Sequence, residues 1–162
     1  MTTSTTPGFT ERTRAKVAAI LTHALAEELL LSSVIRDFSG AVPRFHRLHR
    51  LFLDQYRQLE HGLDQLATRA WALASGTSGN MDELAAARCV ALRERLPERA
   101  MIGELLDVHE RLASRLRDDE RECSQQLGDP SSADLLTRLV EFHETTAWLL
   151  RMVLEEPDST RV

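Results

Sequence analysis

The most suggestive chemical group in the sequence is a pair of histidines three residues apart. His46 and His49 stand in the run His-Arg-Leu-His. If this run is helical, residues three apart share one face, and two imidazoles there supply half the ligands of a transition-metal site. The same spacing also fits polar residues on a solvated helix face, so both interpretations stay open.

Asp64 follows His49 by 15 residues, with no helix-breaking residue type except Gly62 between them. Fifteen helical residues span about 22 Å, so one copy of the chain cannot bring both side chains to one ion. Two antiparallel copies of the helix, related by a twofold axis, could place His49 of one copy opposite Asp64 of the other. The spacing therefore favours a metal site shared between subunits.

The remaining histidines carry weaker signals. His23, His61, His109 and His143 are expected to be surface residues or hydrogen-bonded structural residues. No Glu is followed by His at the third position, which argues against the di-iron site that many helical bundles hold inside one subunit. No phosphate-binding loop, nucleophile elbow or Cys-x-x-Cys pair is present.

The apolar spacing predicts that these side chains are carried by long helices. Thr10 is a candidate N-cap for a first helix that ends near Gly40, and a second helix is expected over 44–75. A short helix at 81–93 would lie in the crossover, before long helices that end near Gly128 and Pro157. This order predicts an all-α, ferritin-like four-helix bundle with a short helix between helices two and three. The expected divisions are a flexible tail at 1–9, the bundle at 10–156 and a short tail at 157–162.

Composition limits the class of protein. The 162 residues are 43% hydrophobic, 28% charged and only 5% aromatic, which is typical of one helical globular domain. No uninterrupted apolar run of about 18 residues is present, which predicts that no helix spans a membrane. Two cysteines, Cys89 and Cys123, suggest a reducing cytoplasm. The net charge of −5 argues against a protein built to hold nucleic acid.

Several segments together resemble the Dps family, the mini-ferritins named as DNA-binding proteins from starved cells. The resemblance covers about residues 20–155 and lies in the segments 45–52, Tyr56, Asp64, Ala67, 101–106, 128–129, 133–136, 142–144 and 147–148. It implies a hollow dodecamer built from dimers, oxidation of Fe(II), typically by hydrogen peroxide, and storage of ferric mineral. It also implies an iron site between two subunits, made of two His from one and an Asp and a Glu from the other.

Only part of that ligand set is present. The family's second His corresponds to His49 and its Asp to Asp64, but its Glu corresponds to Thr68. Its first His corresponds to Asp37 or, if the following loop carries an insertion, to Ile35. Asp37, His46 or Glu60 could replace the lost ligands. The resemblance thus implies a weakened, altered or absent ferroxidase site, because threonine is a poor, neutral iron ligand.

The family's iron-entry pores are lined by carboxylates, which correspond to Asp129 and Asp134. Both residues also suit the start of the last helix as cap and first-turn acids. A third pore carboxylate of some members corresponds to Arg138, which would weaken the acidic funnel. The N-terminal tail is rich in threonine where the family usually has basic residues, so nucleic-acid binding is expected to be weak or absent, even if the protein is nucleoid-associated.

Three functions remain open from the sequence. The first is an iron-oxidising and iron-storing mini-ferritin that protects against oxidative stress. The second is a catalytically degenerate relative with a structural or regulatory role, and the third is an unrelated helical interaction module. The apolar residues around Leu29–Leu31, Phe38, Phe45 and Phe52 exceed what one helix face needs, which predicts that some are buried between subunits of a homo-oligomer.

Overall fold

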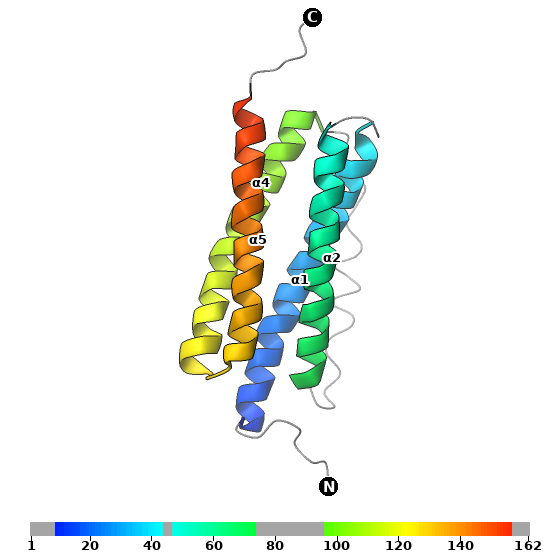
Figure 1. Cartoon of the computed structure of the whole chain (residues 1–162). Helices are drawn as coiled ribbons and strands as arrows, with labels where there is room; N and C mark the ends of the chain where they lie inside the picture. The colour runs from blue at the N-terminus through cyan, green and yellow to red at the C-terminus, as the bar shows by residue number, and fades with distance from the viewer. Residues whose placement is uncertain (1–8, 44–46, 74–95, 157–162) are drawn as a thin grey trace, which may run out of the picture.

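The computed structural model describes residues 9–43, 47–73 and 96–156. Over these ranges the chain forms long helices and no strand (Figure 1). The elements in chain order are α1 (Glu11–Ala41), α2 (Arg47–Leu73), α4 (Glu98–Arg121), the π-helical turn η1 (Glu122–Gln126) and α5 (Pro130–Glu155). The prediction of an all-α four-helix bundle is confirmed, and the described part of the second helix predicted over 44–75 is α2 (Arg47–Leu73). The predicted short helix at 81–93 lies outside the described residues.

The bundle consists of two helical hairpins. Helices α1 and α2 pack along their length, and α4 and α5 do the same, whereas contacts between the two pairs are sparser. Figure 1 shows that α1 and α5 run in one direction while α2 and α4 run in the other. The end of α2 and the start of α4 therefore lie at opposite ends of the bundle.

Local signals in the sequence start and stop the helices where expected. The Thr10 side chain accepts a hydrogen bond from the Thr13 backbone N–H at 3.1 Å, which caps α1. Gly128 has a φ of 64°, a left-handed conformation that glycine adopts without strain, and it separates η1 from α5. The π-helical turn itself was not predicted. It leaves the Cys123 carbonyl free to accept the Asp129 backbone N–H at 2.9 Å.

The core is apolar and continuous across both hairpins. Leu31, Phe38 and Phe52 are each at most 4% exposed, and the two phenylalanine rings pack 6.3 Å apart. The expectation that this surplus covers a subunit contact was therefore wrong for these residues, because a single chain already buries them. Leu30 of the predicted surplus is 37% exposed, and the other large apolar side chains left exposed in the described ranges are Trp71, Trp148, Leu149 and Met152.

Helix α1 is the element that bears on the expectation that no helix spans a membrane. By length and composition alone it is apolar enough to cross a membrane, although charged residues interrupt its apolar run. The core helix of a bundle passes the same test, and α1 buries Val17, Leu21 and Ile35 completely against its neighbours. The helix also carries Glu28, a charged-type residue that is 0% exposed inside the protein. Packing within the bundle thus accounts for the apolar character of α1.

One polar connection ties the end of α2 to the start of α5. The Arg69 guanidinium donates to both carboxylate oxygens of Asp129 at 2.9 Å. Asp129 is 1% exposed and also accepts hydrogen bonds from the Ser132 backbone N–H at 3.1 Å and hydroxyl at 2.6 Å. Burial alone would raise the pKa of Asp129, but these hydrogen bonds from Ser132 and Arg69 outweigh it and lower the pKa. The carboxylate therefore stays ionised as the N-cap of α5.

Replacing Arg69 with Ala should lower the free energy of unfolding by about 2 kcal/mol, because it leaves a buried carboxylate short of one charged donor. Urea unfolding followed by circular dichroism measures this. The matched control is Arg138→Ala, which removes the exposed ion pair with Asp134 and should cost less than about 0.5 kcal/mol. Equal effects of the two changes would contradict a special role for the buried pair.

The pH dependence of this connection follows from the depressed pKa of Asp129. The free energy of unfolding that the ionised carboxylate contributes should be lost as the pH falls below about 4.

Candidate functional site

His49 is held in a defined orientation on the first turns of α2. Its Nδ1 atom lies 2.9 Å from the backbone carbonyl oxygen of Ser39 on α1 and 3.3 Å from the Ser39 hydroxyl. A carbonyl only accepts, so the ring donates its Nδ1–H and carries the lone pair on Nε2. A histidine oriented by a backbone carbonyl in this way is a typical metal ligand.

The other candidate ligands occupy separate places on the surface of the single chain. Asp64 and Thr68 are exposed on α2, and Asp37 is exposed on α1. Neither Asp37 nor Asp64 has an ion-pair or hydrogen-bond partner within the described part of the chain. His46 lies outside that part. Within the described residues, no three His, Cys, Asp or Glu side chains converge on a point where one subunit could hold a metal ion.

The structure distinguishes between the two positions considered for the missing histidine. Ile35 is completely buried and carries no ligand atom, whereas Asp37 presents a carboxylate to solvent. The neighbour Phe38 is buried against Phe52 and offers no polar atom. Of the two positions, Asp37 alone supplies a group that can bind a cation.

Tyr56 lies on α2 between His49 and Asp64, in a small polar cluster with residues of both helices. Its hydroxyl interacts with Glu60 and with Ser32, and the Arg36 guanidinium carbon lies 5.7 Å from the ring centre. The hydrogen bond to Glu60, followed by burial and the charge of Glu60, raises the pKa of Tyr56 above its ordinary value. Glu60 is thus already engaged, which reduces its availability as a substitute metal ligand.

The two residues matched to pore carboxylates differ in accessibility. Asp129 is buried and fully engaged as the helix cap described above, so the prediction that it caps the last helix is confirmed. Asp134 is exposed but forms an ion pair with Arg138 one turn later on α5. Arg138 therefore offsets the negative charge of the exposed carboxylate, whichever surface it faces.

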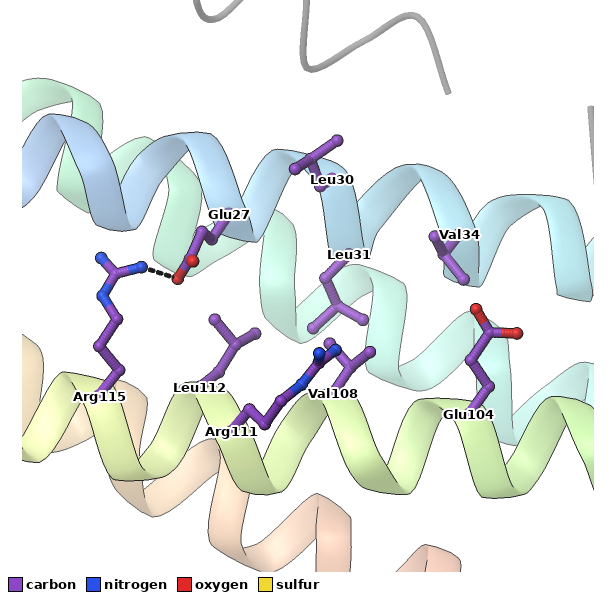
Figure 2. Close-up of a pocket in the computed structure, with 9 residues that line it drawn as sticks. All are labelled: Glu27, Leu30, Leu31, Val34, Glu104, Val108, Arg111, Leu112 and Arg115. Carbon is purple, nitrogen blue, oxygen red and sulfur yellow. Dashed lines mark ion pairs between the residues drawn. The ribbon is translucent and has the colours of Figure 1, made fainter. Parts of the chain in front are cut away.

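A cleft of about 470 Å³ lies between α1 and α4, the two helices whose hairpins meet there. Figure 2 shows Leu31 and Leu112 facing its interior, with Arg111 beside them and the Glu27–Arg115 ion pair at one end. Its lining holds two acidic and two basic residues, and neither His nor Cys. The cleft thus lacks the donor set of a transition-metal site.

His109 and His143 were expected to be surface residues or hydrogen-bonded structural residues, and the structure shows that both are buried and hydrogen-bonded, to each other and to a third titratable group. Both are 0% exposed, and their Nδ1 atoms lie 2.8 Å apart. His143 Nε2 also lies 2.7 Å from a carboxylate oxygen of Glu28, which is equally buried. The signal was present in the sequence, because each residue takes the place of an apolar one in a helical stripe such as Leu105, His109, Leu112 and Leu116.

Comparison with known proteins gives a consistent family. No protein-family model matches the chain. An uncharacterised low temperature-induced protein of Nostoc sp. is 30% identical over 164 residues, covering 95% of this chain and 90% of the relative, and a homolog from Anabaena variabilis matches equally. The X-ray structure of Dps from Thermosynechococcus elongatus is 26% identical, covers 93% of this chain and 98% of its own, and superposes with a TM-score of 0.78.

The chain belongs to the Dps family. Other Dps structures share the fold at lower identity. Mycobacterium smegmatis Dps has a TM-score of 0.82 at 23% identity, over 98% of this chain and 91% of that one. Dps from Vibrio cholerae, described as a member of a broad superfamily of ferritin-like diiron-carboxylate proteins, has a TM-score of 0.81 at 21% identity, over 96% of this chain and 99% of that one. For this Dps protein the four helices of the family fold are therefore kept, while the residues at the positions matched to the family's iron ligands differ in part.

Tyr56 is the single tyrosine of the chain, so its titration can be followed by absorbance near 295 nm. We expect phenolate to form at a higher pH in the folded protein than in guanidinium chloride, because Glu60 accepts the phenolic proton's hydrogen bond. Glu60→Gln should move the folded-state midpoint toward that of the unfolded chain. An unchanged midpoint in the Glu60→Gln variant would contradict this local arrangement.

Proposed function

We propose that this Dps protein forms a homo-oligomer that binds and oxidises Fe(II) and sequesters the ferric product, at a weakened site shared by two subunits. The observation that carries the proposal is that His49 and Asp64 each present a ligand atom that no other described residue engages. The Nε2 atom of His49 has no partner in the described part of the chain, and Asp64 is exposed and unpaired there. Both lie on α2, separated by about 22 Å of helix, so only a second copy can complete the site.

The chemistry of the proposed site follows from its donor atoms. Fe(II) is bound well by imidazole nitrogen and carboxylate oxygen, and His49 and Asp64 would supply one of each. Asp37 adds a second carboxylate that would favour the more highly charged Fe(III) product. Hydrogen peroxide would take one electron from each of two Fe(II) ions and leave as water after protonation. Thr68 contributes only a neutral hydroxyl, which is why the site is proposed to be weaker than a complete one.

Exposed apolar side chains support assembly. Trp71 is 66% exposed, and Trp148, Leu149 and Met152 on the last turns of α5 are 40–55% exposed. Large apolar groups gathered on one helix end are typical of surfaces that another subunit covers. We propose a dodecamer built from dimers, as the family resemblance implies. In that shell the exposed Asp134 would line an iron-entry pore, with Arg138 reducing its pull on Fe(II). The pore position predicted for Asp129 is not proposed, because that carboxylate is 1% exposed and caps α5.

The proposed setting is the cytoplasm, and nucleic acid is not a proposed main partner. The chain carries 25 acidic and 20 basic residues, giving a net charge of −5. A protein with this balance would repel a phosphate backbone unless a local basic surface overcame it. Any association with DNA is therefore proposed to be weak and easily removed by salt.

A second function stands beside the first, favoured by Thr68 and by the absence of a histidine at Asp37. In this alternative the protein is a catalytically degenerate Dps with a structural or regulatory role and no iron mineralisation. The two proposals differ in one measurable property, namely whether the assembled protein accelerates Fe(II) oxidation.

Fe(II) oxidation with hydrogen peroxide, followed by ferric absorbance, should be faster with protein than in buffer. His49→Ala and Asp64→Ala should each bring the rate close to that of buffer, because each removes one of the two remaining matched ligands. His61→Ala is the control and should leave the rate unchanged, because His61 is an exposed histidine of α2 that is hydrogen-bonded to Gln65. A wild-type rate equal to that of buffer would overturn the first proposal and favour the second.

Thr68→Glu tests the explanation for the weakness of the site. Supplying a carboxylate at the exposed position of Thr68 should raise the oxidation rate at least about tenfold. Thr137→Glu, at an exposed threonine of α5, is the matched control for added negative charge. If both variants accelerate oxidation equally, the effect is one of surface charge and the proposed site is not where the reaction occurs.

Native mass at ordinary salt tests the proposed assembly. Twelve chains of 18.3 kDa would weigh about 220 kDa, and two would weigh about 37 kDa. We expect the larger mass, and Trp148→Glu should shift it toward the smaller because a charge would enter an apolar contact. A dimer as the largest wild-type species would leave no cavity for mineral and would contradict the storage function.

A further inference from the structure

Three titratable side chains form a hydrogen-bonded line through the interior of the bundle. Glu28 on α1 contacts His143 on α5 at 2.7 Å, and His143 contacts His109 on α4 at 2.8 Å. All three are 0% exposed. The line joins the two helical hairpins, because α1 belongs to one and both histidines belong to the other.

The proton count of this line follows from its burial. An isolated buried charge is far more costly than a buried ion pair, so the three groups together must be neutral. Neutrality is met when Glu28 and His143 share one proton in the hydrogen bond between them and His109 is uncharged. Wherever that shared proton resides, His143 donates its Nδ1–H to the Nδ1 lone pair of His109. The proton of His109 resides on Nε2, which has no protein partner in the described structure.

His109 is the member of the line that resists protonation. Burial is the main cause and the neighbouring His143 the second, and together they lower the pKa of His109 from 6.5 to about 3. The His109 ring also packs edge-on against the Phe142 ring, with centroids 5.8 Å apart. Phe142 has no polar atom that could stabilise a charge on His109. The titratable groups of the other helices in this line are His143 of α5 and Glu28 of α1. On α4 itself, the charged residues next to His109, Glu110 and Arg111, are exposed.

We propose that Glu28, His143 and His109 form a buried proton-binding lock, in which uncharged His109 keeps the two hairpins joined and a proton on His109 releases them. A second proton removes the only lone pair that His143 Nδ1–H can reach, so two N–H groups face each other at 2.8 Å. It also adds an uncompensated positive charge to a region whose three side chains are 0% exposed. Both histidines lie on the α4–α5 hairpin, so the added charge is relieved only when water reaches the line, and water enters where α1, which carries Glu28, separates from that hairpin.

The sign of the pH dependence follows directly. Below pH 6.5 His109 binds a proton in the unfolded chain, whereas in the folded chain it does not bind one until about pH 3. The ratio of folded to unfolded protein therefore falls with acid, by about tenfold for each pH unit and about thirtyfold between neutral pH and pH 5 from this group alone.

The test is urea unfolding of the assembled protein at several pH values between 7.5 and 5, at one fixed protein concentration because association also stabilises the fold. His109→Asn keeps an acceptor near the position of Nδ1 but cannot titrate, so it should be less acid-sensitive than wild type by about thirtyfold at pH 5. His61→Asn, at the exposed histidine of α2, should retain the acid sensitivity of wild type. Equal acid sensitivity of His109→Asn and wild type would overturn the proposal.

A spectroscopic measurement keeps the proposal testable if His109→Asn does not fold. Nitrogen-15 chemical shifts of the imidazoles in the wild-type protein should show His109 uncharged at pH 5 with its proton on Nε2, and a proton on Nδ1 of His143. Assignment uses single His→Gln changes at exposed His23 and His61, which leave the buried pair intact. A His109 ring that titrates near pH 6.5 in the folded protein would overturn the proposal.

Discussion

The structure depends on how two well-packed hairpins are held against each other. Within each hairpin, long apolar helix faces meet along their whole length, and hydrophobic burial suffices to fix them. Between hairpins the contacts are sparser, and specific polar connections assume more importance. Arg69 joins α2 to the Asp129 cap of α5, Arg115 joins α4 to Glu27 of α1, and the buried line from Glu28 to His109 crosses the centre. Such connections select one alignment of the hairpins, because a shift of one helical turn would leave buried charges unpaired.

The same arrangement separates two kinds of chemistry. Inside the bundle, where ferritin-like proteins can hold metal, the titratable groups of this Dps protein are committed to one another and form a line with no point of convergence. On the surface of α2, in contrast, His49 has a fixed orientation and an unoccupied nitrogen, and Asp64 is free of ion pairs in the described structure. The described interior therefore commits its titratable groups to one another, whereas the surface of α2 carries the residues proposed to bind iron.

The partial ligand set is the main feature that distinguishes this protein from what its family membership implies. Thr68 and Asp37 replace a carboxylate and an imidazole, so the charge and the donor strength of the shared site both change. Arg138 acts in the same direction at the exposed carboxylate of Asp134. These substitutions do not disturb the fold, because Asp37, Thr68 and Arg138 are all exposed. The residue types at the proposed iron-binding positions can thus change without disturbing the bundle.

The sequence by itself determined the helices, their order and several of their ends, since apolar spacing, the Thr10 cap and Gly128 act through short-range physics. The family resemblance added His49, Asp64 and the missing ligands, which are matters of residue type at a position. Only the tertiary structure decided that His109, His143 and Glu28 meet, because they are 34 and 115 residues apart and their contact depends on how the hairpins align. It also decided that Asp129 is a buried cap, that Leu31 and Phe38 are covered by their own chain, and that Trp148 is not. These outcomes depend on which face each helix turns inward, a choice made by the sum of all packing contacts rather than by any local signal.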